Sequence, residues 1–165
     1  MYRLSITLLF ATLAFQACTI RYGMLDGSID ADTFSVALFE EQASNAPAGY
    51  GATFTDFLKD FVISRTKLNL KNEGADIEIS GKITSYGTTP LSVQANDAAA
   101  LNRLSVTVAV TVLNNKDESQ SFESNFTQFS DYNADQELAN VENDLLSDIN
   151  TKLSQDIINR LTSNW

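Results

Sequence analysis

The 165-residue sequence contains no histidine and only one cysteine. Without histidine, the chain lacks the most common general base, the usual zinc ligand and the Ser-His-Asp and Cys-His catalytic arrangements. A single cysteine cannot form an internal disulfide, and no glycine-rich phosphate loop with its lysine is present. The sequence therefore predicts no catalytic site, no metal site and no cofactor.

Positive charge is also scarce. Eleven Lys and Arg residues stand against 21 Asp and Glu residues, for a net charge of −10. Nothing forms a basic stripe, which excludes a nucleic-acid partner. Five of the eleven cations fall in the middle of the chain and are either separate solvated charges or a phosphate-binding patch: Arg65, Lys67, Lys71, Lys82 and Arg103.

The one cysteine, Cys18, directly follows a secretory leader. Arg3 gives a positive start, and residues 4–15 form an apolar run of 12 residues. This run is shorter than the roughly 20 residues that a membrane-spanning helix needs. We interpret residues 1–17 as a lipoprotein signal peptide and residues 18–30 as a tether lipidated at Cys18. The alternative is an ordinary leader followed by an unused free thiol.

Residues 31–165 are long enough for one globular domain. Period-two alternation predicts four strands, and apolar spacing of three and four residues predicts two helices. The strands fall at 33–39, 75–86, 104–112 and 122–131, and the helices around 54–62 and 135–163. The order β-α-β-β-β-α predicts an α+β, two-layer sandwich. Its four-stranded, mixed or antiparallel sheet carries both helices on one face.

Local patterns refine this expectation. Thr53 with Asp56 resembles a capping box, and Asn133 or Asp135 is the expected N-cap of the last helix. Phe129 changes parity within its strand, which suggests a β-bulge there. We expect one core formed by Val106, Val108, Val110, Phe57, Phe61, Leu145 and Ile149.

The sheet face away from this core is polar. On the central strands it carries Ser80, Lys82, Thr84, Arg103, Ser105, Thr107 and Thr111. The face is either plain solvent-exposed surface or a surface that lies against a polar partner.

Five segments resemble the LptE lipoproteins of the Bacteroidota through their order and spacing. They are GKITSYGTTP (81–90), VQAN (93–96), ALNRLSVTV (100–108), FTQFSDY (126–132) and IINRLTSNW (157–165). The resemblance covers nearly the whole chain, Cys18 included.

The resemblance implies a fold with two helices on one face of a four-stranded sheet. It also implies an outer-membrane lipoprotein that plugs the LptD β-barrel, assists barrel assembly and binds lipopolysaccharide. Cys18 is the one residue whose role transfers, as the lipid anchor. The segment 19–22 lacks the acidic run associated with surface export in this bacterial group, so the resemblance favours a periplasm-facing protein within the barrel lumen.

A barrel lumen of this class is polar and wet, so we expect the polar sheet face to meet it. The candidate barrel-facing residues are Lys82, Thr84, Asn96, Arg103, Ser105, Thr107 and Thr111. Lys82 and Arg103 are also candidates for contact with the phosphates of lipopolysaccharide. Two other functions remain open on the sequence: an auxiliary lipoprotein of an ABC-type transport system and, with less support, a small periplasmic enzyme.

Overall fold

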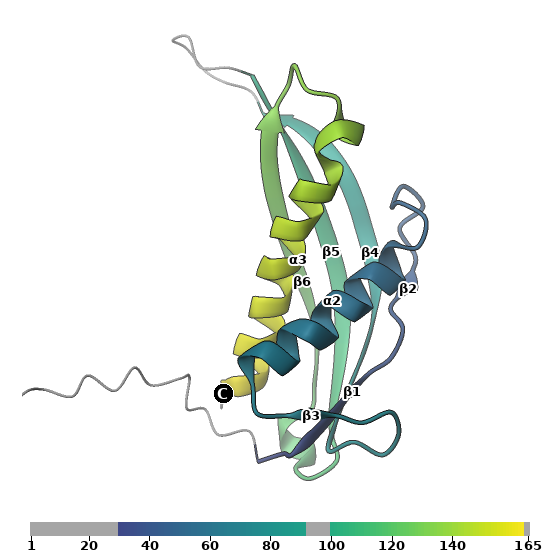
Figure 1. The fold of residues 1–165 in the computed structure, drawn as a ribbon, viewed down its shortest axis with the longest axis vertical. Coiled ribbons are helices and arrows are strands. Elements are labelled where there is room, and N and C mark those ends of the chain that lie inside the picture. Colours follow the sequence, from purple (N-terminus) through teal and green to yellow (C-terminus); the bar gives the residue numbers. More distant parts are fainter. Residues whose placement is uncertain (1–29, 92–99, 164–165) are drawn as a thin grey trace, which may run out of the picture.

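The computed structural model describes residues 30–91 and 100–163. It has two layers, with a long curved sheet on one side and the helices α2 and α3 on the other (Figure 1). In chain order the elements are β1 (Thr33–Val36), β2 (Glu40–Glu41), α2 (Tyr50–Arg65), β3 (Asn69–Leu70), β4 (Ile77–Leu91), β5 (Leu101–Asn114), the 3₁₀ turn η1 (Glu118–Gln120), β6 (Phe122–Asn133) and α3 (Leu138–Thr162).

The sheet is mixed and has the strand order β3-β1-β4-β5-β6, with β2 also paired to β4. β1 runs parallel to both of its neighbours, whereas β4, β5 and β6 form an antiparallel meander. The expected α+β sandwich is confirmed, but the sheet has six strands rather than four. The two additional strands, β2 and β3, have two residues each, which is too short to show a period-two pattern.

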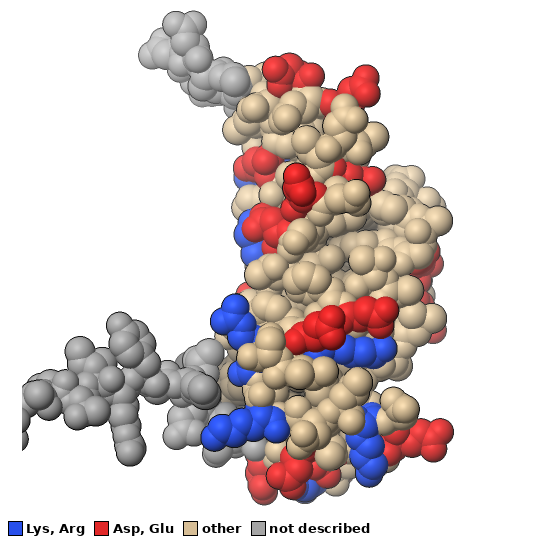
Figure 2. Space-filling view, viewed as in Figure 1, with Lys and Arg blue, Asp and Glu red and all other residues tan. Residues whose placement is uncertain are grey.

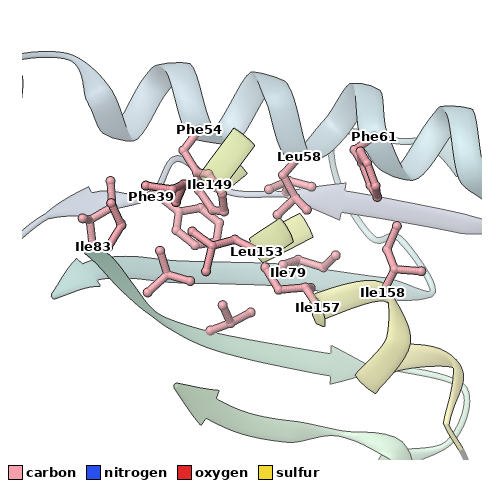
Figure 3. Close-up of a cluster of buried hydrophobic side chains, with 14 of the residues drawn as sticks. Phe39, Phe54, Leu58, Phe61, Ile79, Ile83, Ile149, Leu153, Ile157 and Ile158 are labelled. Carbon is pink, nitrogen blue, oxygen red and sulfur yellow. The ribbon is translucent and has the colours of Figure 1, made fainter. Parts of the chain in front are cut away.

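The core lies between the sheet and both helices. Val106, Val108 and Val110 on β5 are fully buried. Figure 3 shows side chains of α2 and α3, among them Leu58 and Leu153, packed over Ile79 of β4. The seven predicted core residues all belong to this cluster, with Phe57 only partly buried at its margin. The deep burial of β5 provides a large apolar driving force, because each buried valine contributes about 1.5–3 kcal/mol.

The predicted bulge in the last strand is wrong. β6 pairs with β5 in unbroken register from Phe122 to Asn133, so Phe129 points away from the helices without any irregularity. The bulge lies in β4 instead, where the register shifts between Ile83 and Ser85. Because of this bulge, the Tyr86 side chain points to the helix-covered face, where its ring is buried.

Neither predicted helix cap is present. α2 begins at Tyr50, so Thr53 lies inside the first turn and its hydroxyl donates to the Gly49 carbonyl (3.2 Å). α3 begins at Leu138, and Glu137, rather than Asn133 or Asp135, occupies its N-cap position without a side-chain cap.

A carboxylate outside the helix accepts one of the free backbone N–H groups at the N-terminus of α2. Oε1 of Glu41, on β2, accepts the Gly51 N–H at 2.8 Å, and a carboxylate at a helix N-terminus is favoured by the helix dipole. The buried Thr55 hydroxyl accepts the Phe39 N–H at 2.9 Å. Gly81 leaves room for the Phe39 ring, because a Cβ there would lie 2.5 Å from both that ring and the Ala109 carbonyl oxygen. These contacts fix α2 against β4.

Two tyrosines anchor α3 to the rest of the core. Tyr50 donates its hydroxyl to Asn150 Oδ1 at 2.7 Å, and Tyr86 donates to the Glu142 carboxylate. Burial raises the pKa of both phenols, so they stay protonated donors across the physiological range. The long helix is thereby held to α2 and to β4.

Substitution by aspartate should destabilise the protein much more on the buried face of β5 than on its exposed face. Val108→Asp places an unpaired charge in the core, and we expect a loss of more than about 4 kcal/mol, enough to prevent folding of a domain of ordinary stability. Thr107→Asp, one residue away on the other face, should cost no more than about 1 kcal/mol. Circular dichroism shows whether each variant folds, and urea unfolding measures the loss in a variant that does. Equal damage from both would contradict a sheet covered on one face only.

Candidate functional site

The side of the sheet opposite α2 and α3 carries no helix within the described residues (Figure 1). We call this side the open face. It consists of the outward side chains of the three long strands: Ser80, Lys82, Thr84 and Ser85 on β4; Arg103, Ser105, Thr107, Ala109, Thr111 and Leu113 on β5; and Glu123, Asn125, Thr127, Phe129 and Asp131 on β6. Most of these side chains are small and polar.

Hydroxyl groups form the centre of the open face. Thr107 and Thr127 are directly opposite each other on β5 and β6, and their Oγ1 atoms are hydrogen-bonded at 2.9 Å. Thr84, the residue at the β4 bulge, donates its hydroxyl to the Thr107 carbonyl at 3.3 Å. Cross-strand hydroxyl pairs of this kind stabilise a sheet while leaving it hydrated. The centre of the face is thus polar but carries no charge.

A charged and aromatic cluster lies near the N-terminal end of β5. Nε and Nη2 of Arg103 donate to the two carboxylate oxygens of Asp131 at 2.7 and 2.9 Å. The guanidinium also lies 3.6 Å from the ring centroid of Phe129, whose side chain is 40% exposed. The hydrogen bond from Arg103 holds the pKa of Asp131 below its usual value, so this ion pair persists to a lower pH than the charge of an ordinary aspartate and is lost only as the pH falls through that lowered pKa.

Lys82 lies elsewhere on the face and has its own partner, Glu40, at 3.5 Å. It is opposite Ala109 in the register, six residues along β5 from Arg103, which corresponds to about 20 Å. Lys82 and Arg103 therefore cannot bind one phosphate together. Their contact with lipopolysaccharide phosphates stays a prediction, and it requires two separate phosphates.

The five cations singled out in the sequence do not form one patch. Arg65 ends α2 in the helix layer, and Lys67 and Lys71 flank β3, whereas Lys82 and Arg103 are on the open face. Figure 2 shows the helix side, where acidic side chains gather along the first half of α3 and basic ones toward the end at which both helices finish. On the helix side (Figure 2), the surface along the first half of α3 is therefore mainly acidic.

A shallow hollow of about 370 Å³ opens on the β1 side of the open face. Its floor includes Ser35, Glu78, Ser80 and the exposed Leu113, and the loop 72–74 forms a wall. The hollow is lined by two carboxylates, Glu73 and Glu78, together with hydroxyl and aliphatic side chains. It is an open depression in the surface rather than an enclosed binding pocket.

Two predicted functional residues, Cys18 and Asn96, lie outside the described residues. Within 30–91 and 100–163 no three His, Cys, Asp or Glu side chains come close enough to hold a metal ion together. In the same part of the chain no helix combines the length and apolar character needed to cross a membrane.

The sequence did not reveal the partners of the predicted residues. Asp131 is 28 residues from Arg103 along the chain, and Glu40 is 42 residues from Lys82. Phe129 was assigned to a bulge, although the alternation Glu123, Asn125, Thr127 was a signal that it belongs to the polar face. The register of β6 on β5 brings these groups together.

Comparison with known families identifies the chain. A family model described as LptE, lipopolysaccharide-assembly, matches residues 31–161. The chain belongs to the LptE family. Its role is therefore that of a lipopolysaccharide-assembly lipoprotein, and this match favours the first of the three functions left open by the sequence.

Solved structures share the fold of this LptE protein at low identity. A minor lipoprotein from Acinetobacter baumannii is 16% identical with a TM-score of 0.50, and the match covers 81% of this chain and 94% of that one. A hypothetical protein from Chlamydia trachomatis is 13% identical with a TM-score of 0.51, covering 80% and 96%. None of the curated proteins matches this chain.

Proposed function

We propose that this protein is the lipid-anchored plug and assembly partner of an LptD-type outer-membrane β-barrel. In this proposal it lies within the barrel lumen, faces the periplasm and contributes to lipopolysaccharide transport to the outer leaflet. The observation that carries the proposal is a sheet covered by helices on one side and left polar and uncovered on the other, in a chain whose family is LptE.

The open face has the chemistry that a barrel lumen requires. Lumen surfaces of outer-membrane barrels are polar and hydrated, so a docking surface there must be polar yet already satisfied in its hydrogen bonds. The Thr107–Thr127 pair and the Arg103–Asp131 pair meet this condition before any partner binds. Binding at these two pairs would then leave no unpaired charge or hydroxyl to desolvate.

The small size of the outward side chains is the second property that supports the proposal. The outward side chains on the middle of β5 are Ser105, Thr107, Ala109 and Thr111, all small and half-exposed. A closely approaching wall could contact many of them at once, with Arg103 and Phe129 projecting at one end as larger groups. Aromatic and arginine side chains of this kind are enriched among residues that dominate binding energy.

Site-specific photocrosslinking in cells tests the proposed orientation. A photocrosslinking amino acid at Thr107 should capture the barrel, because this position is at the centre of the open face. The same amino acid at Thr151, an exposed position on α3, is the matched control and should capture it much less. Mass identification of the captured protein decides the result, and capture from Thr151 alone would overturn this orientation.

The membrane anchor is part of the same proposal. Several acyl chains on Cys18 would hold the chain at the membrane, since each buried CH₂ contributes about 0.8 kcal/mol. We expect the mature protein to begin at an acylated Cys18, and we expect Cys18→Ala to leave the precursor unprocessed. Intact mass measurement of the protein purified from membranes checks this, and a free thiol without acyl mass would contradict it.

A further inference from the structure

The outer edge of β6 is a long strand edge without a partner strand. β6 spans Phe122–Asn133 and pairs only with β5 on its inner side. No other strand in the described part of the chain lies along its outer side. Edges of this length are unusual in proteins, because unpaired backbone groups are a template for an added strand.

The direction of the backbone groups follows from the register. The Thr107 carbonyl accepts the Thr84 hydroxyl, so the odd-numbered residues of β5 direct their backbone toward β4 and the even-numbered residues toward β6. Even-numbered β5 residues are opposite even-numbered β6 residues. The odd-numbered β6 residues therefore direct both N–H and C=O to the free edge. The Asn133 carbonyl already accepts the Gln136 N–H, which leaves five residues: Glu123, Asn125, Thr127, Phe129 and Asp131.

Each of these five residues is exposed, and none makes a backbone hydrogen bond on the free side within the described residues. One side chain does reach this edge. Lys152, on α3, donates from Nζ to the Phe129 carbonyl at 3.0 Å, and the same ammonium group contacts the Asp148 carboxylate at 2.6 Å. A positively charged donor thus occupies the position where the N–H of an added strand would bind.

The charge along this edge identifies the kind of segment that fits it. Glu123 lies near one end of the free edge and has no ion-pair partner within the described residues, whereas Asp131 at the other end is paired with Arg103 and Asp148 with Lys152. A second copy of this chain, paired antiparallel about Thr127, would place Glu123 opposite the Asp131–Arg103 pair, which offers it no unpaired cation. Opposite charges across paired strands stabilise the pairing. The edge therefore suits an extended segment with a Lys or Arg opposite Glu123.

We propose that a basic, extended segment of the barrel protein adds to β6 as a further strand and displaces Lys152 from the Phe129 carbonyl. This inference rests on the proposed function. The segment must come from outside the closed wall of the barrel, since wall strands already have both edges paired. The five outward-directed residues span about 30 Å, enough for a strand of ordinary length or longer.

Proline at Thr127 tests this directly. The Thr127 N–H points to the free edge, so Thr127→Pro removes a docking donor without removing a hydrogen bond to β5, and proline is tolerated on edge strands. Thr127→Ala is the matched control, because it also loses the hydroxyl contact with Thr107 but keeps the N–H. We expect Thr127→Pro to reduce barrel co-purification by about 2- to 10-fold relative to Thr127→Ala, as expected for one net hydrogen bond.

A charge reversal keeps the proposal testable if the proline variant does not fold. Glu123→Lys should weaken barrel co-purification more at low salt than at high salt, because the segment is basic. Glu73→Lys makes the same change on the loop beside the hollow, far from this edge, and should have little effect. Thermal unfolding of all four variants shows which of them are folded.

The outcomes separate this inference from the proposed function. If a photocrosslinker at Thr107 captures the barrel while Thr127→Pro and Glu123→Lys match their controls, strand addition is wrong and the plug proposal stands. If a photocrosslinker at Thr107 captures no barrel in a protein without any other substitution, both the plug proposal and strand addition are wrong. Loss of co-purification in the folded Thr127→Pro variant, with co-purification of Thr127→Ala retained, supports strand addition.

Discussion

The strict alternation of β5 is the constraint on which the rest of the molecule depends. Leu104, Val106, Val108, Val110 and Val112 are each fully buried, and every residue between them points to the opposite side. A shift by one residue would exchange the two faces completely. The helices must therefore cover one face, and the polar residues of the other face cannot contribute to the core.

The other features of the fold adapt to this arrangement. The β4 bulge returns Tyr86 to the covered side, where it donates a hydrogen bond to α3. On the uncovered side, polar groups satisfy one another across the strands, as in the Arg103–Asp131 pair. A face that is uncovered but internally satisfied can remain in water or lie against a wet surface at similar cost. This property connects the fold to a role inside a barrel.

The sequence predicted the parts of the fold that repeat a period over many residues. Long alternation located β4 and β5, and apolar spacing located α2 and α3, because these patterns extend over several turns or pleats. The sequence did not predict β2 and β3, because two residues are too few to show a period-two pattern. The predicted cap of α2 was wrong because Glu41, on β2, accepts a backbone N–H at its start, and the start of α3 has no side-chain cap. The polar face was predictable from parity, whereas the partners of Lys82 and Arg103 depend on tertiary register.

Hydroxyl-radical footprinting tests the central claim, that the open face meets the barrel, without any substitution. Leu113 and Phe129 are 49% and 40% exposed on the open face, and Ile63 is 48% exposed in the helix layer. All three should oxidise in the free protein. In the complex with the barrel we expect oxidation of Leu113 and Phe129 to fall sharply while that of Ile63 changes little. Protection of Ile63 with unchanged Leu113 and Phe129 would contradict the account.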